Sequence, residues 1–322
     1  MPEELQKDII KVIALIHIKI NKKLAQKTIN ELREDNVIDA NYLIKHDNNY
    51  VYIPVKMPLK NYEIIDIDGN RKDDNNTKIS FSYDVIGDMA IIKGKTENEV
   101  NCLAKELIKR KNIDRIYLDT GISGEFRTRS LKLIYGNDKK ETLYHENSIN
   151  LMVNMDKAYF SPRLSTERLR ISNEINENEY IIDMFCGIGP FSILIAKKTK
   201  CNIIAMDKNP DAIELLRANI KLNKLKGDIT PLNGDSEELV KNYNNVDRII
   251  MNLPHNAYDF LDVAFKALKT KGIINYYEIC DLDTLEKRME FFKNSGFEIV
   301  YKRIVHGFSK YMNMYSIEIK KI

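Results

Sequence analysis

The chain has 322 residues, 43% of them hydrophobic and 30% charged, which is ordinary for a soluble globular protein of two or three domains. Its 50 basic and 47 acidic residues leave a net charge of only +3, so the total alone does not indicate a nucleic-acid-binding protein. The apolar run at 12–16 is too short to cross a bilayer, and the early Glu3 and Glu4 do not fit a signal peptide, so we expect a cytoplasmic protein that does not contact membranes.

Residues 1–67 predict a small α+β module. The β-branched apolar run VIALIHIKI (12–20) indicates a strand, and a helical pattern follows from about 22 to 33. Two further apolar runs flank Asp47-Asn48-Asn49, which is typical of a hairpin. The polar stretch DGNRKDDNNTK (68–78) then indicates an exposed linker or a mobile loop tip.

Residues 79–170 predict a second α+β module. The stretch FSYDVIGDMAIIKG indicates a bent strand or hairpin. Thr96 and Glu99 have the spacing of a capping box, which opens a helix that runs to about Lys111. Further apolar runs predict strands near 114–118, 131–135, 142–146 and 150–154.

Residues 171–322 alternate strand patterns with helical ones. The strand patterns are YIID, NIIAMD, DITPL, VDRIIM, GIINYYEI and FEIVYKRIV, with helical segments between most of them. This alternation predicts an α/β fold with a mostly parallel, doubly wound sheet.

The cysteines and histidines do not indicate a metal site. The four cysteines lack CxxC spacing, which indicates reduced thiols; they are Cys102, Cys186, Cys201 and Cys280. The five histidines form no pair at the spacing of metal ligands, so we expect no metal.

The stretch DMFCGIGPFSI (183–193) lies between a predicted strand and a predicted helix, which is the context of a nucleotide-binding loop. Gly187 and Gly189 let the backbone approach a ligand closely. The third glycine of a dinucleotide fingerprint is missing, and Pro190, which suits a first helical position, stands in that region. The loop therefore does not demand a phosphate.

Three acidic residues favour S-adenosylmethionine over NAD as the cofactor. Asp207 ends the next strand, where an acid accepts hydrogen bonds from a ribose diol. Asp183 can face the positively charged amino group of the methionine portion, and Asp235, after the third strand, can reach the adenine. The alternatives are NAD, or a fold that binds no nucleotide.

A second candidate site follows the fourth strand, in MNLPHNAYDFL (251–261). Asn252 would lie at the carboxyl edge of the sheet, where open α/β sheets bind ligands, and Pro254 would stiffen the turn that aims it. An amide offers a donor and an acceptor, which suits a heteroaromatic base. Leu253 and His255 depart from the Asn-Pro-Pro-aromatic pattern of enzymes that methylate exocyclic amines. The alternative is a turn with a helix cap.

The segment DKAYFSPRLSTERLRI (156–171) makes a family resemblance specific. The chain resembles the archaeal and eukaryotic type of tRNA (guanine-37 N1)-methyltransferase over nearly its whole length. The segments that carry the resemblance are IKINKK, GEFRTRSLKLIYG, HENSINLMVNMDKAYF, YFSPRLSTER, DMFCGIGPFSI, AMDKNPDAIELLRANIKLNKL and MNLPHNAYDFL.

This resemblance implies a class I, Rossmann-like methyltransferase domain at 171–322, after the two smaller modules. The middle module would help to hold the anticodon loop of tRNA, and the N-terminal module would contact the outer corner of the tRNA. We expect a monomer without an obligate protein partner. The implied contacts to S-adenosylmethionine are Tyr159, Asp183, Phe185, Gly187, Gly189, Asp207, Lys208, Asp235, Asn252 and Pro254.

Methylation of guanine at N1 needs a base, because N1 carries a proton and its lone pair is not free. As the proton leaves, negative charge grows on O6 and calls for a fixed cation. The resemblance implies that Glu167 is the base, that Arg127 is the cation and that Asn252 orients the guanine edge.

Glu167 also has a simpler explanation, an ion pair with Arg163 four residues before it on a helix. The base role carries a tension, because Arg163 and Arg168 would lower the pKa of a neighbouring carboxyl. Burial against the guanine, or arginines turned towards tRNA phosphates, would resolve it.

Several basic residues are candidates for tRNA contacts. Arg127 and Arg129 alternate, so on a strand they would share one face, and the alternative is a solvated basic strand. Arg163 and Arg168 could turn towards phosphates. Near the N-terminus, Lys22 and Lys23 could form a basic face, or be ordinary surface lysines.

One departure from the family pattern lies near the C-terminus, where Ser309 and Lys310 stand in place of Pro-Arg and weaken any phosphate contact there. Three rival functions remain. One is a methyltransferase that acts, alone or in addition, on the tricyclic wyosine intermediate at the same position. Another is the aminocarboxypropyl transferase of that pathway, which usually has Gly-Asn in place of Pro162-Arg163. The third is a tRNA-binding protein with an inactive methyltransferase domain.

Overall fold

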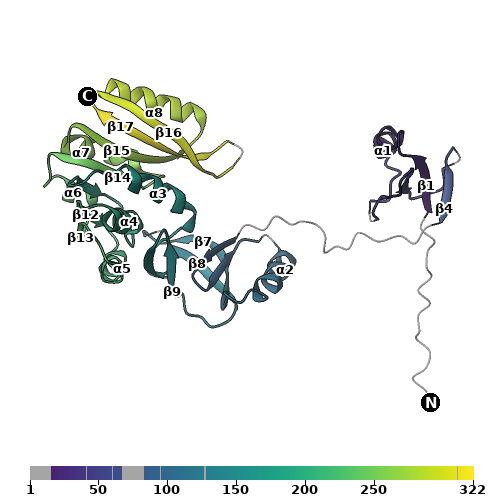
Figure 1. Ribbon diagram of the computed structural model, residues 1–322, viewed down its shortest axis with the longest axis horizontal. Helices are drawn as coiled ribbons and strands as arrows, with labels where there is room; N and C mark the ends of the chain where they lie inside the picture. Colours follow the sequence, from purple (N-terminus) through teal and green to yellow (C-terminus); the bar gives the residue numbers. More distant parts are fainter. Residues whose placement is uncertain are drawn as a thin grey trace, which may run out of the picture. The chain divides into compact units, whose positions relative to one another are not determined.

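The computed structural model describes residues 16–40, 42–59, 61–66, 83–94, 96–126, 128–309 and 311–322. The chain divides into two compact units, 1–80 and 81–322 (Figure 1). The linker predicted at 68–78 lies outside the described residues, as do the first four residues of the strand predicted at 12–20. Within the described residues, no helix is both long and apolar enough to cross a membrane.

The first unit is an α+β module with an antiparallel sheet in the order β2-β3-β1-β4. Its elements are β1 (Ile16–Asn21), α1 (Ala25–Glu34), β2 (Lys45–His46), β3 (Tyr50–Pro54) and β4 (Glu63–Asp66). Ile18 and Ile53 pair across the sheet and pack in one core with Leu32 of α1. The predicted hairpin is confirmed, because the carboxylate of Asp47 accepts the backbone N–H of Tyr50 at 2.7 Å and closes the turn.

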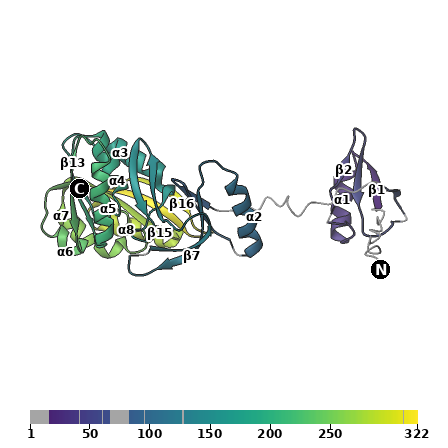
Figure 2. The ribbon, with the colours of Figure 1, turned by 90° about the horizontal axis from the view of Figure 1, so that it is seen from below.

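The second unit begins with a sheet in the order β5-β6-β7-β8. Its elements are β5 (Tyr83–Ile86), β6 (Met89–Ile92), α2 (Glu97–Ile108), β7 (Arg115–Ser123) and β8 (Thr128–Tyr135). The predicted capping box is confirmed, because Thr96 Oγ1 accepts the Glu99 N–H and Glu99 Oε2 accepts the Thr96 N–H. Helix α2 packs against β6 and β7 (Figure 2).

The remainder of this unit is built on a sheet in the order β13-β12-β11-β14-β15-β17-β16. The strands from β13 to β15 are parallel and β17 is antiparallel to both of its neighbours, which confirms the mostly parallel, doubly wound sheet. The strands are β11 (Tyr180–Asp183), β12 (Asn202–Asp207), β13 (Asp228–Asn233), β14 (Val246–Met251), β15 (Leu268–Cys280), β16 (Phe297–Gly307) and β17 (Asn313–Lys321).

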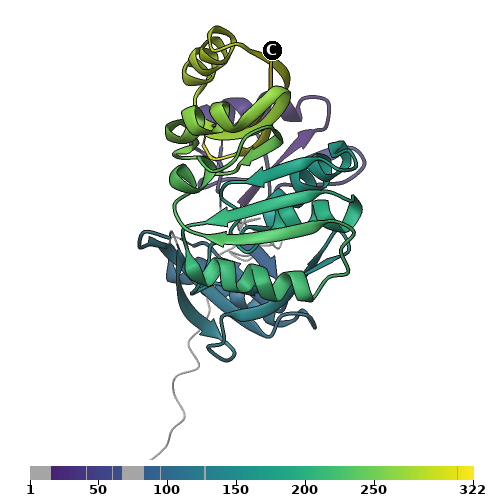
Figure 3. The same cartoon turned by 90° about the vertical axis from the view of Figure 1, so that its left-hand side faces the viewer.

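Helices cover both faces of this sheet (Figure 3). Because successive strand residues point to opposite faces, Ile181 packs with α3, α4 and α5, whereas Ile182 packs with α6, α7 and α8. The helices are α3 (Ser165–Glu174), α4 (Pro190–Lys198), α5 (Pro210–Lys221), α6 (Ser236–Val240), α7 (Leu261–Ala267) and α8 (Leu282–Asn294), with 3₁₀ turns η2 (Pro162–Leu164) and η3 (Ala257–Phe260).

A hairpin, β9 (Glu141–Glu146) and β10 (Ile149–Asn154), precedes the sheet in the chain and packs on α5. Leu151 and Val153 of β10 are fully buried in the core that also contains α4 and α5. Asn223 donates to the Asn150 carbonyl at 2.7 Å and accepts its N–H at 3.0 Å. The hairpin is therefore anchored to the core, and this anchors the start of the segment that carries Tyr159.

Candidate active site

A cavity of about 1030 Å³ opens where the parallel strands end. Residues that follow β11, β12, β13 and β14 line it, as expected for the carboxyl edge of an open α/β sheet. Other walls come from the sheet β5-β6-β7-β8, the η2 turn and β16. The lining includes Phe126, Arg129, Tyr159, Arg163, Arg168, Phe185, Gly187, Asp207, Lys208, Asp235, Asn252, Pro254 and His306.

The glycine loop has the backbone that the sequence predicts. Gly187 has φ +53°, and a Cβ there would meet only the Tyr159 carbonyl oxygen, at 3.9 Å, so the loop leaves open space beside it. Gly189 has φ +86°, and a Cβ there would lie 2.2 Å from Leu216 Cδ1. Pro190 opens α4, as expected. Gly187 therefore leaves room for a ligand, whereas Gly189 allows the loop to pack.

Asp207 lies at the end of β12 and lines the cavity. Its two carboxylate oxygens accept the N–H groups of Gly187 and Asn209, at 2.8 and 2.9 Å. Burial raises the pKa of Asp207, although both N–H groups oppose the shift. Each oxygen has a second lone pair, so the carboxylate can still accept hydrogen bonds from a diol.

Asp183 ends β11 beneath the loop and is not among the residues that line the cavity. Ser192 donates to its Oδ2 at 2.7 Å, whereas Oδ1 is buried without a hydrogen-bond partner. Burial, with a contribution from the charge of Asp207, raises the pKa of Asp183 to about 7 despite the bond from Ser192. A cationic group nearby would stabilise the ionised form.

Asn252 follows β14 and lines the cavity, and its Oδ1 is also buried without a partner. The alternative explanation for this segment was a turn with a helix cap. The N-cap position of η3 is occupied by Asn256, so Asn252 does not have that role. Pro254 lines the cavity too, and its carbonyl accepts the N–H of Ile279 at 2.8 Å, which fixes the turn. The unpaired oxygen of Asn252 fits a ligand with N–H donors, such as S-adenosylmethionine, whereas that of Asp183 lies outside the cavity lining.

Four other residues expected at the cofactor line the cavity. The ring of Phe185 packs edge-on against Phe260, with centroids 4.9 Å apart. Tyr159 is half exposed. Lys208 pairs with Glu125 at 2.7 Å, and Asp235 caps α6 by accepting the Glu237 N–H.

Arg129 and Arg163 share the carboxylate of Asp84, although Arg129 is buried and Arg163 is exposed. Arg129 is 7% exposed and pairs with Asp84 at 3.1 Å and with Asp119 at 3.7 Å. Arg163 pairs with Asp84 at 2.7 Å, and its Nη1 lies 3.1 Å from Nε2 of His306. Because Arg129 is buried in ion pairs, we do not expect it to reach a phosphate.

Arg168 is 2% exposed and forms a bidentate pair with Glu146 of β9, at 2.5 and 2.6 Å. The guanidinium also donates to the Ser161 carbonyl at 3.3 Å. The pair ties α3 to the hairpin. Because Glu146 already neutralises the buried guanidinium, we expect a structural role for Arg168 in place of the phosphate contact expected from the sequence.

Glu167 is 1% exposed and is not among the residues that line the cavity. It pairs with Arg170, not with Arg163 as the simpler explanation predicted. Burial alone would raise the pKa of Glu167, but the hydrogen bonds and charge of Arg170 outweigh it, so the pKa is lowered. Arg163 and Arg168 point to other carboxylates, so the tension that the sequence raised lies with Arg170 instead.

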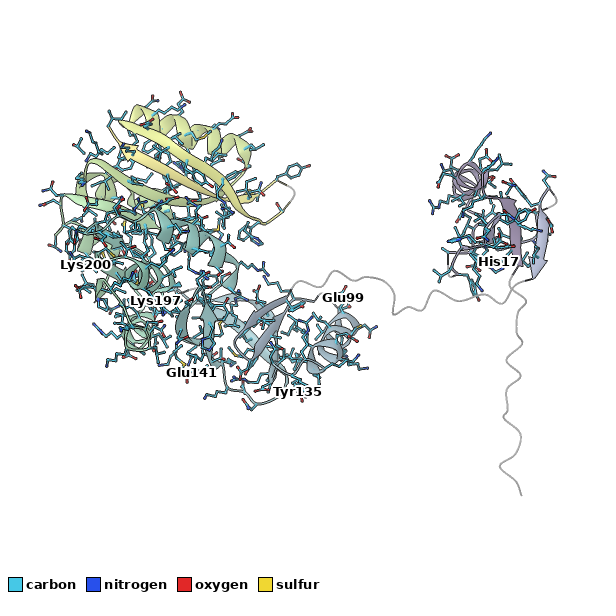
Figure 4. The ribbon with its side chains drawn as sticks, viewed as in Figure 1. His17, Glu99, Tyr135, Glu141, Lys197 and Lys200 are labelled. Carbon is cyan, nitrogen blue, oxygen red and sulfur yellow. The ribbon has the colours of Figure 1, made fainter. Side chains whose placement is uncertain are left out.

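Two groups of candidates lie elsewhere. Arg127 lies outside the described residues, although its neighbour Phe126 lines the cavity. Lys22 and Lys23 are exposed in the first unit, directly after β1, the strand that carries His17 in Figure 4. Among the described residues, no cluster of His, Cys, Asp and Glu could hold a metal ion.

The sequence did not single out Asp84, Arg170, Tyr277 or His306, all of which contact predicted site residues. Only Arg170 had a local signal, since it lies three residues after Glu167 on a predicted helix. A bulge between Ile304 and His306 pairs Arg303 with Ser316 and His306 with Met314, which places Arg303 and His306 on the same face of β16. No pattern in the sequence predicted that bulge.

The strand order, the glycine loop after β11 and the acid after β12 define a class I methyltransferase domain. A model of the TRM5/TYW2 methyltransferase domain matches residues 142–303. The tRNA methyltransferase 5 N-terminal domain matches 18–63 and the TYW2 N-terminal domain matches 67–139. The chain belongs to the TRM5/TYW2 methyltransferase family.

Curated relatives agree. A tRNA (guanine(37)-N(1))-methyltransferase Trm5b from Methanocaldococcus jannaschii is 37% identical, over 91% of this chain and 94% of that protein. The Trm5b of Pyrococcus abyssi is 39% identical, over 81% of this chain and 83% of that protein. A relative from Nanoarchaeum equitans, named as a tRNA (guanine(37)-N(1))/4-demethylwyosine(37)-methyltransferase, is 32% identical over 74% of this chain and 85% of that protein.

Solved structures are similar over nearly the whole chain. A structure described as the complex of aTrm5 and tRNALeu has a TM-score of 0.68 at 33% identity, and covers 95% of this chain and 100% of that one. Methanocaldococcus jannaschii Trm5 in complex with adenosine has a TM-score of 0.65 at 31% identity, and covers 95% of this chain and 99% of that one.

Proposed function

We propose that this chain transfers the methyl group of S-adenosylmethionine to N1 of guanosine 37 in tRNA. The cavity carries the proposal, because three segments that match the family motifs meet there. They are the turn after Tyr159, the loop at Gly187 and the strand end at Asn252. The names of the two Trm5b relatives support the same reaction.

S-adenosylmethionine supplies an activated methyl group when it is bound. Asp207 would accept hydrogen bonds from the ribose hydroxyls, because it ends β12, the second strand of the methyltransferase domain, and lies beside the glycine loop. The unpaired oxygen of Asp183 lies beneath the glycine loop, so the loop would have to shift for this oxygen to face the ammonium group. Asp235, which lines the cavity, would reach the adenine. Phe185, Gly187, Tyr159, Lys208 and Pro254 would complete the binding site, and Gly189, which does not line the cavity, would support it by letting the loop pack.

Asn252 would fix the edge of the guanine. Its Oδ1 needs a donor, and the N1–H and amino groups of guanine are donors. To enter the cavity, the guanine would leave its stack in the anticodon loop.

Glu167 would take the proton from N1. The N1–H bond breaks as the carboxylate gains the proton, and the electron pair that stays on N1 becomes the nucleophile. For this, the side chain must turn from Arg170 towards the cavity, since its carboxylate is held by Arg170 in the structure. Arg127 would stabilise the charge that grows on O6, an assignment supported by the family motif.

The division of labour along the chain is also a proposal. Residues 79–170 would contribute to binding of the anticodon loop, 171–322 would hold the cofactor and 1–67 would contact the outer corner of tRNA. Arg163 and the exposed Lys22 and Lys23 remain candidates for phosphate contacts. The boundaries at 67, 78 and 170 stay predictions.

The test is incubation of the protein with labelled S-adenosylmethionine and tRNA transcripts that carry guanine or adenine at position 37, followed by nucleoside analysis. We expect N1-methylguanosine from the guanine transcript alone. Glu167→Gln should bind the cofactor normally but lose about 10²- to 10⁴-fold in rate, the usual contribution of a general base. Product from neither transcript would overturn the assignment.

A second substrate is supported by the name of the Nanoarchaeum relative, which covers both guanosine and the tricyclic base. The same assay with tRNA that carries 4-demethylwyosine tests this dual activity. Methylation of that tRNA together with the guanine transcript would establish both activities, whereas methylation of the tricyclic base alone would move the chain to the wyosine branch. Transfer of an aminocarboxypropyl group instead of a methyl group would identify the chain as the aminocarboxypropyl transferase of the wyosine pathway.

A further inference from the structure

Arg170 of α3 is bound by three carboxylates at once. Its Nη2 and Nε donate to Glu167 at 2.6 and 3.1 Å, and its Nη1 donates to Glu174 at 2.7 Å and to Glu318 of β17. The guanidinium also lies 4.4 Å from the centre of the Tyr301 ring. One partly buried cation is therefore shared between the proposed base and two other acids.

Three strands contribute polar groups around Glu167 and Arg170. On β15, Tyr277 donates to Oε1 at 3.0 Å. On β16, Arg303 lies 3.7 Å from Oε2. On β17, Ser316 accepts from Arg170 at 3.2 Å. The carboxylate is thus held on the side of the sheet strands, outside the lining of the cavity.

We propose that Arg170 is a positioning residue that holds Glu167 outside the cavity until guanine enters, and that Glu174 and Glu318 then retain its guanidinium. This inference rests on the general-base role proposed above. It adds a resting state and a release step to that role.

The carboxylates of Glu174 and Glu318 lower the free-energy cost of releasing Glu167 from Arg170. Breaking an isolated buried ion pair is costly, because one charge is left without a partner. When Glu167 turns away, Arg170 keeps Glu174 and Glu318 and remains neutralised. The cluster also has more acids than it needs, which agrees with the raised pKa of Glu174, caused by burial and by the charge of Glu318. A single Arg–Glu pair could not exchange partners in this way.

Release would also change the chemistry of the base. In the resting position, Arg170 keeps the pKa of Glu167 low, which makes the carboxylate a weak base. Away from Arg170 and Tyr277, and against a guanine, the same carboxyl loses those stabilising contacts, so its pKa rises. The resting state and the guanine-bound state should therefore titrate differently.

The experiment measures single-turnover methyl transfer against pH for the wild type and Arg170→Met. Enzyme is in excess of tRNA throughout. Rates at enzyme concentrations below the dissociation constant report the pKa of Glu167 in the free protein, and rates at saturating enzyme report its pKa in the tRNA complex. In the wild type, we expect the acid limb to lie at lower pH in the free state than in the bound state. In Arg170→Met, we expect the free-state limb to move to higher pH while the bound-state limb stays in place.

Two outcomes would overturn the inference. If neither limb moves, Arg170 has only a structural role. If both limbs move together, Arg170 stays paired with Glu167 during the reaction and no release occurs. Arg248→Met is the matched control, because it removes another buried arginine that pairs with Glu179 and lies 4.0 Å from Glu174 but has no bond to Glu167. It should leave both limbs unchanged.

Glu318→Gln keeps the inference testable if Arg170→Met does not fold. It removes one of the spare carboxylates, so Arg170 should hold Glu167 longer. We expect a slower rate at saturating enzyme and no upward shift of the free-state limb, and an unchanged rate would count against the release step. Glu167→Gln separates the two proposals, since full activity in that variant would reject the base role whatever Arg170 does.

Discussion

Asn219, on the buried face of α5, donates a 3.1 Å hydrogen bond to the main-chain carbonyl of Ile188 in the glycine loop. The same amide accepts the N–H of Met152 in β10 at 2.6 Å and donates to its carbonyl at 3.2 Å. One side chain with no exposed surface therefore connects the cofactor loop to the hairpin that leads into the Tyr159 segment.

Asn219→Leu should destabilise the protein by about 1–3 kcal/mol for each buried main-chain group that it leaves unpaired. Urea unfolding measures this loss. Asn223→Leu is the control, because Asn223 makes a similar pair of bonds to Asn150 but is partly exposed, so water can replace it. Equal losses in the two variants would contradict the special role of Asn219.

The two loop glycines should fail in different ways. Gly189→Ala should destabilise the fold, because its methyl group would clash with Leu216 and its left-handed backbone costs roughly 1–2 kcal/mol more. Gly187→Ala meets only the backbone strain, since no side chain lies near its Cβ, and it should mainly weaken cofactor binding. Thermal unfolding and calorimetric titration distinguish the two, and the reverse pattern would reject this account of the loop.

Cofactor binding should release protons near neutral pH. Burial raises the pKa of Asp183 to about 7, and an ammonium group beside it would lower that pKa again. The affinity for S-adenosylmethionine should therefore rise with pH through 7, with proton release visible in calorimetry in buffers of different ionisation enthalpy. Adenosine, which has no ammonium group, is the control, and equal proton release for both ligands would remove Asp183 from that contact.

The same carboxyl should set part of the pH dependence of stability. Because the pKa of Asp183 is raised from 3.8 to about 7 in the folded protein, its contribution is full below 3.8 and is lost as the pH rises through 7. Asp183→Asn stays neutral, so its advantage in unfolding free energy over the wild type should grow from pH 5 to pH 8. A constant difference over that range would show that Asp183 is not protonated in the free protein.

The Arg168–Glu146 pair should support the fold and not tRNA binding. Arg168→Met should cost about 3–5 kcal/mol of stability, because it leaves a buried carboxylate unpaired, and the added change Glu146→Met should recover part of that loss. Urea unfolding of the two single variants and the double variant measures the coupling. Weaker tRNA binding at unchanged stability would restore the phosphate contact first expected for Arg168.

Lys22 and Lys23 should act through phosphate contacts. If each meets one phosphate, the double change to Ala should weaken tRNA binding and reduce the salt dependence of the binding constant by about 0.7–0.9 per contact. Lys200→Ala, at an exposed lysine after α4 that Figure 4 labels, is the control and should leave the slope unchanged. Filter binding over a range of salt concentrations measures both, and an unchanged slope in the double variant would make these ordinary surface lysines.

The parts of the site that sequence predicts well are those with local causes. Asp207, Gly187 and Asn252 each follow a strand, and the ends of parallel strands meet at one edge of a sheet. Their convergence on one cavity therefore follows from the strand pattern, and the position of Pro190 at the start of α4 follows from its fixed φ.

The arginines were harder to predict, because their partners come from distant parts of the chain. Arg163 pairs with Asp84 of β5, Arg168 with Glu146 of β9, and Arg170 with Glu318 of β17. These pairs depend on how three sheets pack and on the register of their strands, and neither is a property of any short segment. Sequence therefore singled out Arg163 and Arg168 but not Arg170, and it did not show that carboxylates already neutralise all three.

The bulge in β16 gives this site a means of variation that needs no change of side chain. If β16 instead paired regularly beyond Ile304, Val305 would lie opposite Met314 and His306 would turn to the opposite face, away from Arg163, while Arg303 stayed beside Glu167. The bulge thus decides which side chains of the C-terminal hairpin reach the cavity. Gain or loss of a bulge in this edge strand is a route by which chains with the same catalytic motifs could diverge in substrate.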